Sequence, residues 1–539
     1  MTPVTSHGPG GDAAGGGEAA RADAAGGEGA GSEGAAGVPG KVAVSDRART
    51  GRSGPGGAGA VPPGSGVSPR EALAAPAGRG SRALLIAGSL VAAVAGVAYI
   101  VALATHPWKS LLNGFDLEVY LGGAHEALHH AVNLYSWHYQ HDLGIQFTYT
   151  PFAALLFAAG LAMPFRVLMG LVSVASTFAL FATVWIAFRE LGWRPLASRA
   201  GAALLVTGLA FWTEPVQRAL YLGQVELVLM AAVTWDMCQP DRRRWKGAAL
   251  GVAAGIKLVP LLFIVYLLLT RRFRAAVVAC LSFLATVVIG FAALPHPSVT
   301  WWLRGNFWQA GRTGFVGDQQ NQSLRGLLTR FAGSVSAGQV PWLCLAVLVA
   351  VIGLAAAVVL WNCGRQWGPF AGFMACALTA LLVSPISWDH HWVWIAPGVV
   401  LLIDAGVRAG RRAAGAGSRA RRGLTGIRWA SQAWWFGLAG LVLVAYGGWP
   451  DFWRPHAGLL QGGLINYAPA AVFAHGDNPA YPEYHWYGLQ LIAGNLYLLG
   501  GIGLFAVTMA VAAWLLHGGG RGLLSVPLPS PKRREHAAA

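Results

Sequence analysis

Long apolar blocks recur along this chain, and they constrain its fold more than any other feature. The clearest contain about 20 residues, the length of helix that crosses a bilayer core about 30 Å thick. They cover residues 83–105, 167–188, 275–294, 342–361 and 502–516. A helix on a soluble protein would carry a polar face opposite its apolar stripe. Because these blocks lack such a face, the sequence predicts an all-α polytopic integral membrane protein.

Composition and charge placement agree with this prediction. Only 12% of the residues are charged, whereas a soluble domain carries about 25%. The net charge of +16 raises the possibility of a nucleic-acid partner, but the basic residues form short clusters between the apolar blocks. Such clusters are typical of cytoplasmic loops, so we predict membrane lipids and no nucleic acid as partners. The clusters contain Arg242, Arg243, Arg244, Lys246, Arg271, Arg272, Arg274, Arg408, Arg411 and Arg412.

The chain divides into five predicted parts. Residues 1–80 are rich in Gly, Ala and Ser and contain too few large apolar groups to offset the entropy of ordering them. We therefore expect a disordered cytoplasmic tail. A transmembrane module over 81–407 follows, then a basic cytoplasmic loop over 408–432. The final parts are C-terminal spans with an aromatic outer loop over 433–517 and a cytoplasmic tail over 518–539.

Two segments do not fit a simple alternation of spans. Two full crossings within 148–188 would place the following arginines outside, and a short segment over 151–163 that does not cross is one solution. The stretch 247–270 has basic residues on both flanks, and Lys257 and Pro260 interrupt it. A re-entrant pair of half-helices would keep both flanks in the cytoplasm, provided that protein or water covers the freed backbone. The sequence leaves the number of crossings in both segments open.

Asp116 and Glu118 follow the first apolar block, in a loop predicted to lie outside. An acid beside apolar surface can have a raised pKa and act as a general base. Alternatively, Asp116 caps a surface helix over 117–131, because Asp is a favoured N-cap residue. The sequence alone is compatible with both roles.

Two further segments place polar groups at the entrance of apolar runs. Tyr149 belongs to an aromatic turn, and Pro151 after it suits the first turn of a helix. Gln224 and Glu226 precede another apolar run, where polar groups are costly unless they face protein or water. Tyr149, Gln224 and Glu226 are therefore candidates for a substrate pocket, with an ordinary helix start or loop as the alternative.

A later outer loop contains Asn321, Gln322 and Arg325. The two amides and the guanidinium group could hold a phosphate or sugar hydroxyl groups. A solvated loop explains the same residues nearly as well. We predict substrate contacts for the amides and a phosphate contact for Arg325.

A tight outer turn contains Trp388, His390 and His391 between two apolar blocks. An aromatic belt at the membrane interface is one explanation for it. The histidine pair supplies fewer ligands than a metal site needs, so we predict neither a metal nor a cofactor. The two histidines and Trp388 are candidates for substrate or phosphate binding.

The order of these segments, with a Gly-Ile-Lys-Leu-x-Pro break at 255–260, resembles one family. These are the actinobacterial polyprenol-phosphate-mannose-dependent α-(1→2)-mannosyltransferases of the GT-C superfamily. The resemblance runs from about residue 83 to about residue 407. It implies a GT-C-type helical bundle with outer surface helices and re-entrant half-helices. The family's catalytic Asp corresponds to Asp116, and its His to His390 or His391. Glu226 departs from the expected Asn.

The resemblance also implies a reaction. A hexose, expected to be mannose, would pass from a polyprenyl-phosphate donor to a glycolipid or glycan on the outer face of the plasma membrane. Asp116 would take the proton of the acceptor hydroxyl in a single displacement with inversion. Gln224, Arg325, His390 or His391 would hold the donor phosphate, which leaves as a monoester anion.

Two other functions remain to be weighed. A multi-span transporter or lipid flippase would use the same spans and a charge at the membrane midplane such as Lys257. The polar and aromatic residues, however, gather in the outer loops. A non-catalytic scaffold would leave Asp116 and the histidine pair without a role.

Overall fold

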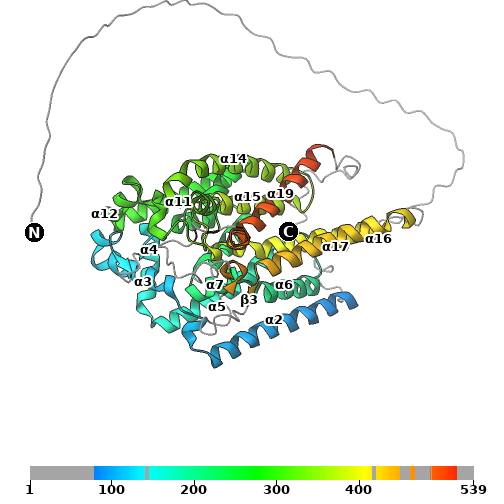
Figure 1. The fold of residues 1–539 in the computed structure, drawn as a ribbon, viewed down its shortest axis with the longest axis horizontal. Helices are drawn as coiled ribbons and strands as arrows, with labels where there is room; N and C mark the ends of the chain where they lie inside the picture. Colours follow the sequence, from blue (N-terminus) through cyan, green and yellow to red (C-terminus); the bar gives the residue numbers. More distant parts are fainter. Residues whose placement is uncertain are drawn as a thin grey trace, which may run out of the picture. The chain divides into compact units, whose positions relative to one another are not determined.

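The structure is a computed structural model that describes residues 78–139, 145–415, 421–449, 462–467, 483, 486 and 488–518. Nearly all of the predicted N-terminal tail, most of the last outer loop and the C-terminal tail therefore lie outside the described residues. The described part is a bundle of helices (Figure 1). Its strands form two small antiparallel hairpins, β1 (His138–Tyr139) with β2 (Ile145–Gln146) and β3 (Gly448–Trp449) with β4 (Gly462–Gly463).

Six helices in the described part are long and apolar enough to cross a membrane, or seven if a bent pair counts as one crossing. This confirms the polytopic all-α prediction. They are α2 (Arg79–Thr105), α5 (Phe165–Glu190), α11 (Phe273–Ala293), α14 (Val335–Trp361), α19 (Leu496–Leu516), and the run Asp389–Arg411 formed by the 3-10 turn η8 (Asp389–Trp394) and α16 (Ile395–Gly415).

The other helices complete the bundle, and all of them except α17 are shorter than these spans. They are α3 (Phe115–His129), α4 (Pro151–Ala158), α6 (Leu196–Phe211), α7 (Glu214–Leu222), α8 (Glu226–Met237), α9 (Ala248–Ile256), α10 (Leu261–Leu269), α12 (Pro295–Ser298), α13 (Leu324–Ala332), α15 (Gly368–Val383), α17 (Arg421–Ala445) and α18 (Leu489–Ala493). Single helical turns lie at η1 (Trp108–Ser110), η2 (Ala131–Asn133), η4 (Ala159–Ala162), η5 (Val299–Leu303), η6 (Asn306–Trp308), η7 (Ala310–Thr313) and η9 (Leu464–Tyr467).

Helices α2 and α6 lie side by side through small residues (Figure 1). A Cβ atom on Gly88 would come within 2.0 Å of the carbonyl oxygen of Gly201, and one on Gly201 would meet the backbone of Leu84. Backbones approach this closely where glycine lines the contact, as is common between membrane helices. A Cβ atom on Gly208 would meet Val91 and Ala92, so the contacts advance along both helices together. Helix α6 therefore runs in the same direction as α2, and α5 between them in the chain returns in the opposite direction.

The segment 148–188 contains one long helix. Thr150 caps α4, with its hydroxyl accepting a hydrogen bond from the backbone N–H of Ala153 at 3.1 Å and with Pro151 in the first turn. Helix α4 and η4 together end at Ala162, so they are shorter than a crossing requires. Helix α5 then forms the full span. The structure therefore agrees with the solution in which residues 151–163 form a short segment that does not cross the membrane.

The segment 247–270 is broken as the sequence suggested, and both of its ends lie at the same end of α11. Asp241 pairs with Lys246 at 2.8 Å before the segment and with Arg272 at 3.0 Å after it. Helix α9 runs beside α11, with Gly247 near Ala275 at the beginning. Helix α10 then returns to the start of α11. The pair of half-helices therefore has the geometry of a re-entrant hairpin.

A second break was not predicted. Helices α7 and α8 meet at an angle of 116° around Gly223, which has a φ of 71° in the left-handed region that favours glycine. Both helices pack against η8, and α3 packs against α7. The backbone N–H of Gly114 donates to the carbonyl of Tyr221 at 2.8 Å, which fixes the start of α3 at this break.

Candidate functional site

The helix breaks at α7–α8 and α9–α10, the start of α3 and the turn η8 surround a cavity of about 830 Å³, which we call the outer cavity. It lies at the opposite end of α9 and α11 from the Asp241 ion pairs. Its polar lining includes Asp116, Tyr120, Tyr149, Arg218, Gln224, Lys257, Asp318, Arg325, Trp388, His390 and His391. Residues from six distant sequence segments thus meet at one site.

Asp116 lies inside α3 and does not cap it. The N-cap position belongs to Gly114, with a φ of 73°, and the helix start has no side-chain cap. The alternative role as an N-cap is therefore wrong for Asp116, because α3 begins at Phe115, earlier than the expected start at residue 117. The Asp116 carboxylate instead accepts a hydrogen bond from Nε2 of Gln224 at 2.5 Å and faces the cavity.

Two tyrosines fix the orientation of Gln224. Its Oε1 accepts a hydrogen bond from the hydroxyl of Tyr120 at 2.5 Å, and the Tyr120 hydroxyl also lies 2.8 Å from that of Tyr149. A tyrosine hydroxyl can donate to the amide oxygen, whereas the amide nitrogen can donate to a carboxylate. Gln224 therefore directs its N–H group at Asp116. This hydrogen bond occupies the Oδ2 atom of Asp116 and leaves Oδ1 without a partner from Gln224.

The electrostatic setting of Asp116 suits a general base. Burial raises its pKa above the usual range, and the neighbouring His390, Gln224, Arg218 and Lys257 lower it in part. A raised pKa brings a carboxylate closer to the value at which proton abstraction is efficient near neutral pH. Burial also raises the pKa of Tyr120 well above its usual value, so its hydroxyl remains protonated and able to donate.

Lys257 lies at the break between α9 and α10 and has two partners. Its Nζ donates to Oε2 of Glu226 at 2.6 Å and lies 2.8 Å from Nε2 of His391. An ammonium group has only donors, so Nε2 of His391 accepts this hydrogen bond and the ring is neutral. Glu226 thus neutralises Lys257 and lies behind the cavity wall, which corrects its predicted place in the substrate pocket.

His390 has a different environment from His391. Its Nδ1 lies 3.1 Å from Oδ1 of Asp389, whose Oδ2 lies 3.7 Å from Nε of Arg218. Among the described residues, Nε2 of His390 is buried and lacks a hydrogen-bond partner, and the side chain lines the cavity. A carboxylate on one ring nitrogen fixes the orientation of the ring and therefore the direction in which the other nitrogen points. His390 is therefore the histidine with a nitrogen available to a ligand.

Asn321 and Gln322 do not line the outer cavity, although we predicted them as substrate contacts. Both are fully buried. Asn321 donates to the carbonyl of Val316 at 2.8 Å and accepts from the N–H of Ser387 at 3.0 Å. Gln322 donates to the carbonyl of Gly494 at 2.7 Å. Their amides hold the loop against η8 and the start of α19, because buried backbone groups need partners.

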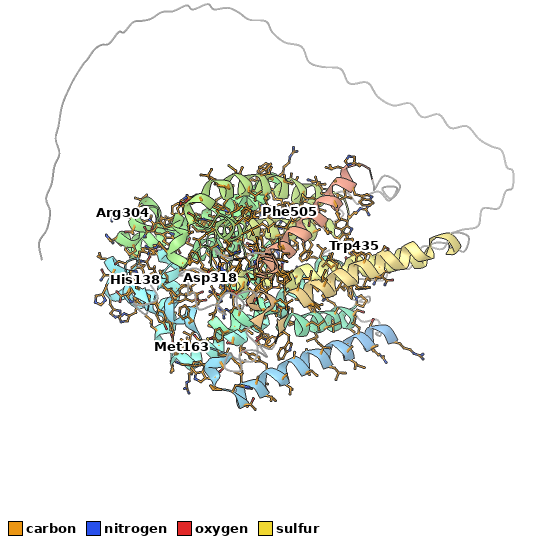
Figure 2. The ribbon with its side chains drawn as sticks, viewed as in Figure 1. His138, Met163, Arg304, Asp318, Trp435 and Phe505 are labelled. Carbon is orange, nitrogen blue, oxygen red and sulfur yellow. The ribbon has the colours of Figure 1, made fainter. Side chains whose placement is uncertain are left out.

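Of the remaining predicted site residues, some line the outer cavity and others do not. Arg325 lines the cavity, with its guanidinium 5.0 Å from the ring centre of Trp342, and Trp388 lies nearby in the wall. Glu118 does not line the cavity, and its carboxylate accepts a hydrogen bond from Tyr139. Asp318 was not predicted. It lines the outer cavity and is labelled in Figure 2, and burial raises its pKa to about 6.

Four further lining or supporting residues were absent from the predicted site. Tyr120 and Arg218 flank recognised motifs, and Asp389 precedes the histidine pair, so each carried a weak signal. Glu214 carried none. Its Oε2 accepts a hydrogen bond from the hydroxyl of Tyr497 at 3.0 Å, across 283 positions of the chain. Within the described ranges, no three His, Cys, Asp or Glu side chains are arranged to hold a metal ion.

Comparisons with known proteins agree on one family. The sequence profile of glycosyltransferase family 87 matches residues 147–385. A polyprenol-phosphate-mannose-dependent alpha-(1-2)-phosphatidylinositol pentamannoside mannosyltransferase of Mycobacterium tuberculosis is 34% identical over 350 residues, which cover 62% of this chain and 79% of the relative. A protein of the same description from Mycolicibacterium smegmatis is 34% identical over 372 residues, 64% of this chain and 87% of the relative.

A second M. tuberculosis relative, a polyprenol-phosphate-mannose-dependent alpha-(1-2)-phosphatidylinositol mannoside mannosyltransferase, is 32% identical over 327 residues, covering 56% of this chain and 74% of the relative. No solved structure matches this chain. The matched region includes Gln224, Lys257 and Arg325 of the outer cavity.

Proposed function

The chain belongs to glycosyltransferase family 87, and we propose that it transfers mannose from a polyprenyl-phosphate donor to a phosphatidylinositol mannoside or a related glycan. The donor and the acceptor class follow the names of relatives that are 34% identical to it. The observation that carries the proposal is the hydrogen bond between Gln224 and Asp116. It holds a desolvated carboxylate at a cavity large enough for a lipid-linked sugar.

The outer cavity would open to the extracytoplasmic side of the plasma membrane. Lys246 and Arg272 share Asp241 at the other end of the bundle. Basic residues between spans favour the cytoplasmic side, which supports this orientation. The donor would then present its sugar from the outer leaflet.

In this mechanism Asp116 acts as the base. Gln224 occupies Oδ2, which leaves Oδ1 for the acceptor hydroxyl. As Asp116 removes the proton, the acceptor oxygen attacks the anomeric carbon from the face opposite the phosphate. The bond to the phosphate oxygen breaks with its electron pair, and polyprenyl phosphate leaves. A β-linked donor would give an α-linked product.

The donor phosphate would bind on the His390 side of the cavity. Nε2 of His390 is oriented by Asp389 and faces no other partner among the described residues. Arg325 offers a guanidinium group at the same cavity. A ring nitrogen of His390 that donates a hydrogen bond, together with the guanidinium group of Arg325, would stabilise the charge that develops on the leaving phosphate. The reaction as proposed uses the lipid-linked sugar as a substrate and involves no separate cofactor.

The polyprenyl chain would lie along the apolar side of the outer cavity. Helix α14 contributes Leu343, Ala346, Val347 and Ala350 to its lining, and Leu343 and Val347 are about half exposed. These side chains extend from the Arg325 end toward the lipid-facing surface. A prenyl chain placed there would remain partly in contact with the bilayer. The free-energy cost of moving the chain from the lipid to the protein would therefore be small.

Donor consumption tests this proposal. Purified protein in detergent would be incubated with radiolabelled polyprenyl-phosphate mannose and phosphatidylinositol mannosides, and the products identified by mass spectrometry. We expect release of polyprenyl phosphate together with a mannosylated acceptor, and insensitivity to a metal chelator. A transporter or flippase would leave the donor intact, and that result would overturn the proposal.

A further inference from the structure

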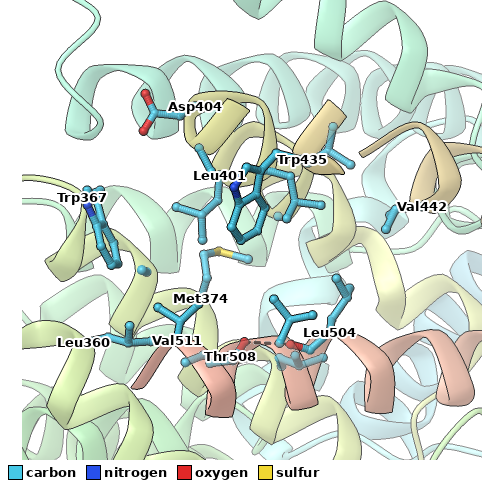
Figure 3. A pocket seen from close by; sticks show the side chains of 18 of the residues that line it. Leu360, Trp367, Met374, Leu401, Asp404, Trp435, Val442, Leu504, Thr508 and Val511 are labelled. Carbon is cyan, nitrogen blue, oxygen red and sulfur yellow. Dashed lines mark hydrogen bonds between the residues drawn. The ribbon is translucent and has the colours of Figure 1, made fainter. Parts of the chain in front are cut away.

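A second pocket, which we call the inner pocket, lies between α15, α16, α17 and α19 and has a volume of about 630 Å³. Figure 3 shows the apolar side chains of Met374, Leu401, Trp435 and Leu504 around it. None of the residues proposed for mannose transfer lines this pocket. It is therefore a separate feature that the proposed function does not explain.

The inner pocket is long and narrow. Its lining follows α16 from Ile395 to Arg408, a distance of about 20 Å at the rise of an α-helix. One leaflet of a bilayer core is about 15 Å thick. The pocket is therefore long enough to hold a hydrocarbon chain along one leaflet, and its modest volume spread over this length suits a single chain.

The two ends of the inner pocket differ. At one end Trp392 is only 1% exposed, and it fills the space beside Gly501, where a Cβ atom would lie 2.4 Å from the indole ring. This end is closed. A lipid cannot place its head group there, nor pass from the outer cavity into the inner pocket past this indole.

The other end carries charge. Arg365 and Arg408 line it together with Asp404. Each oxygen of Asp404 already has a partner, because Oδ1 accepts from the indole N–H of Trp193 at 2.9 Å and Oδ2 accepts from Nε of Arg408 at 2.5 Å. Arg365 lies 5.5 Å from the ring centre of Trp514 and, within the described part of the chain, has no carboxylate partner. One cation is thus left for an external anion.

We propose that the inner pocket binds one anionic phospholipid of the cytoplasmic leaflet, with an acyl chain along α16 and its phosphate at Arg365. The apolar lining provides the site for the chain. The closed Trp392 end and the charged Arg365 end set its direction. Basic residues at a membrane surface attract anionic lipids, and a bound chain fills a space that would otherwise leave these four helices poorly packed.

Gly398 offers a way to fill the inner pocket without disturbing the fold. A Cβ atom at this position would meet only the methyl group of Met374, at 4.0 Å, and both residues line the pocket. Gly398→Leu therefore places a side chain in the space of the lipid chain. Gly96→Leu on α2 is the matched control, because it also adds a side chain to a helix with nothing within 4 Å.

The test is native mass spectrometry of the purified full-length protein after delipidation. Phosphatidylglycerol, phosphatidylcholine with the same acyl chains, or polyprenyl phosphate would be added in separate samples. We expect one tightly bound phosphatidylglycerol. Arg365→Gln should weaken it about fivefold, the effect of one basic residue near an anionic lipid. Gly398→Leu should abolish binding, whereas Gly96→Leu should retain it.

Three outcomes would overturn the proposal: equal binding of the two phospholipids, preferential binding of polyprenyl phosphate, or undiminished binding by the Gly398→Leu variant. Thermal unfolding of each variant, measured in the same detergent, identifies any variant that fails to fold. Arg274→Gln, an exposed arginine outside the inner pocket, controls for a general loss of positive charge. Because binding is measured without turnover, failure here and failure of the proposed mannose transfer are distinguishable.

Discussion

The outer cavity and the inner pocket lie in the same helical bundle but are built differently. The outer cavity forms where helices end: at the α7–α8 bend, at the α9–α10 break and at η8. The inner pocket is surrounded mainly by the sides of longer helices. Helix ends leave backbone groups and small turns at which polar side chains can converge. The chemistry of this protein is therefore expected at the breaks and lipid binding along the continuous helices.

The largest effect should follow from changing Asp116. Asp116→Asn keeps the size of the side chain but removes the proton acceptor, and turnover should fall by about 10²–10⁴-fold. Asp318→Asn is the matched control, because Asp318 lines the same outer cavity but its carboxylate accepts from the N–H of Gln320. Turnover and membrane insertion of both variants would be measured. Similar losses of turnover in both variants would contradict the assignment of Asp116, and not Asp318, as the base.

The second-largest effect should be a difference in turnover between variants of the two histidines. His390→Ala should lower the turnover number by about 10²–10³-fold, the effect typical of losing one group that stabilises a developing anion. His391→Ala should retain more turnover at the same protein level, because His391 contacts Lys257 and has no free Nε2. Steady-state kinetics with labelled donor provide the comparison. A greater loss of turnover in the His391 variant would show that His391, not His390, contacts the donor phosphate.

Removing Gln224 should change the pH dependence. Its hydrogen bond lowers the pKa of Asp116 against the effect of burial, so Gln224→Leu should raise that pKa further. The base is active when deprotonated, and activity should therefore be lost at a higher pH as the solution is acidified. The shift in the acid limb of kcat/KM should be about one pH unit, equivalent to one hydrogen bond of about 1.5 kcal/mol. An unchanged acid limb would separate Gln224 from the base.

The smallest effect is expected in the inner pocket. Gly398→Ala adds one methyl group to α16 that contacts only the methyl group of Met374, at 4.0 Å. It should stabilise the protein by about 0.5–1 kcal/mol, because alanine favours a helix over glycine. Turnover should be unchanged within error, since no group of the outer cavity is touched. Thermal unfolding and a donor-consumption assay would measure both. A clear loss of turnover would mean that the two regions are coupled.

Much of the bundle could be predicted from the sequence because each long apolar block is a local pattern. The interruption near Lys257 was visible for the same reason. Its geometry was not, because Asp241 joins both flanks only in three dimensions. The bend at Gly223 was missed since a single glycine before an apolar run is common and does not by itself indicate a bend between two helices.

The site was predicted less completely than the fold. The local sequence and the family resemblance singled out Asp116, Gln224 and the histidines, which all line the outer cavity, yet most of the partners that orient them are distant in the chain. Asn321 and Gln322 were misplaced because polar residues in an outer loop suggest a binding site equally well whether they contact substrate or backbone. Their bonds to Ser387 and Gly494 depend on the arrangement of loop and helix, which no local pattern records.

The central claim is that one carboxylate, Asp116, acts as the base in a single displacement. The most direct measurement is the anomeric configuration of the transferred mannose, determined by NMR on the product made by the wild-type protein from a β-linked polyprenyl-phosphate donor. The account predicts inversion to an α linkage and no covalent mannosyl–protein intermediate in rapidly quenched reactions. A β-linked product, or a mannosyl group trapped on Asp116, would contradict it.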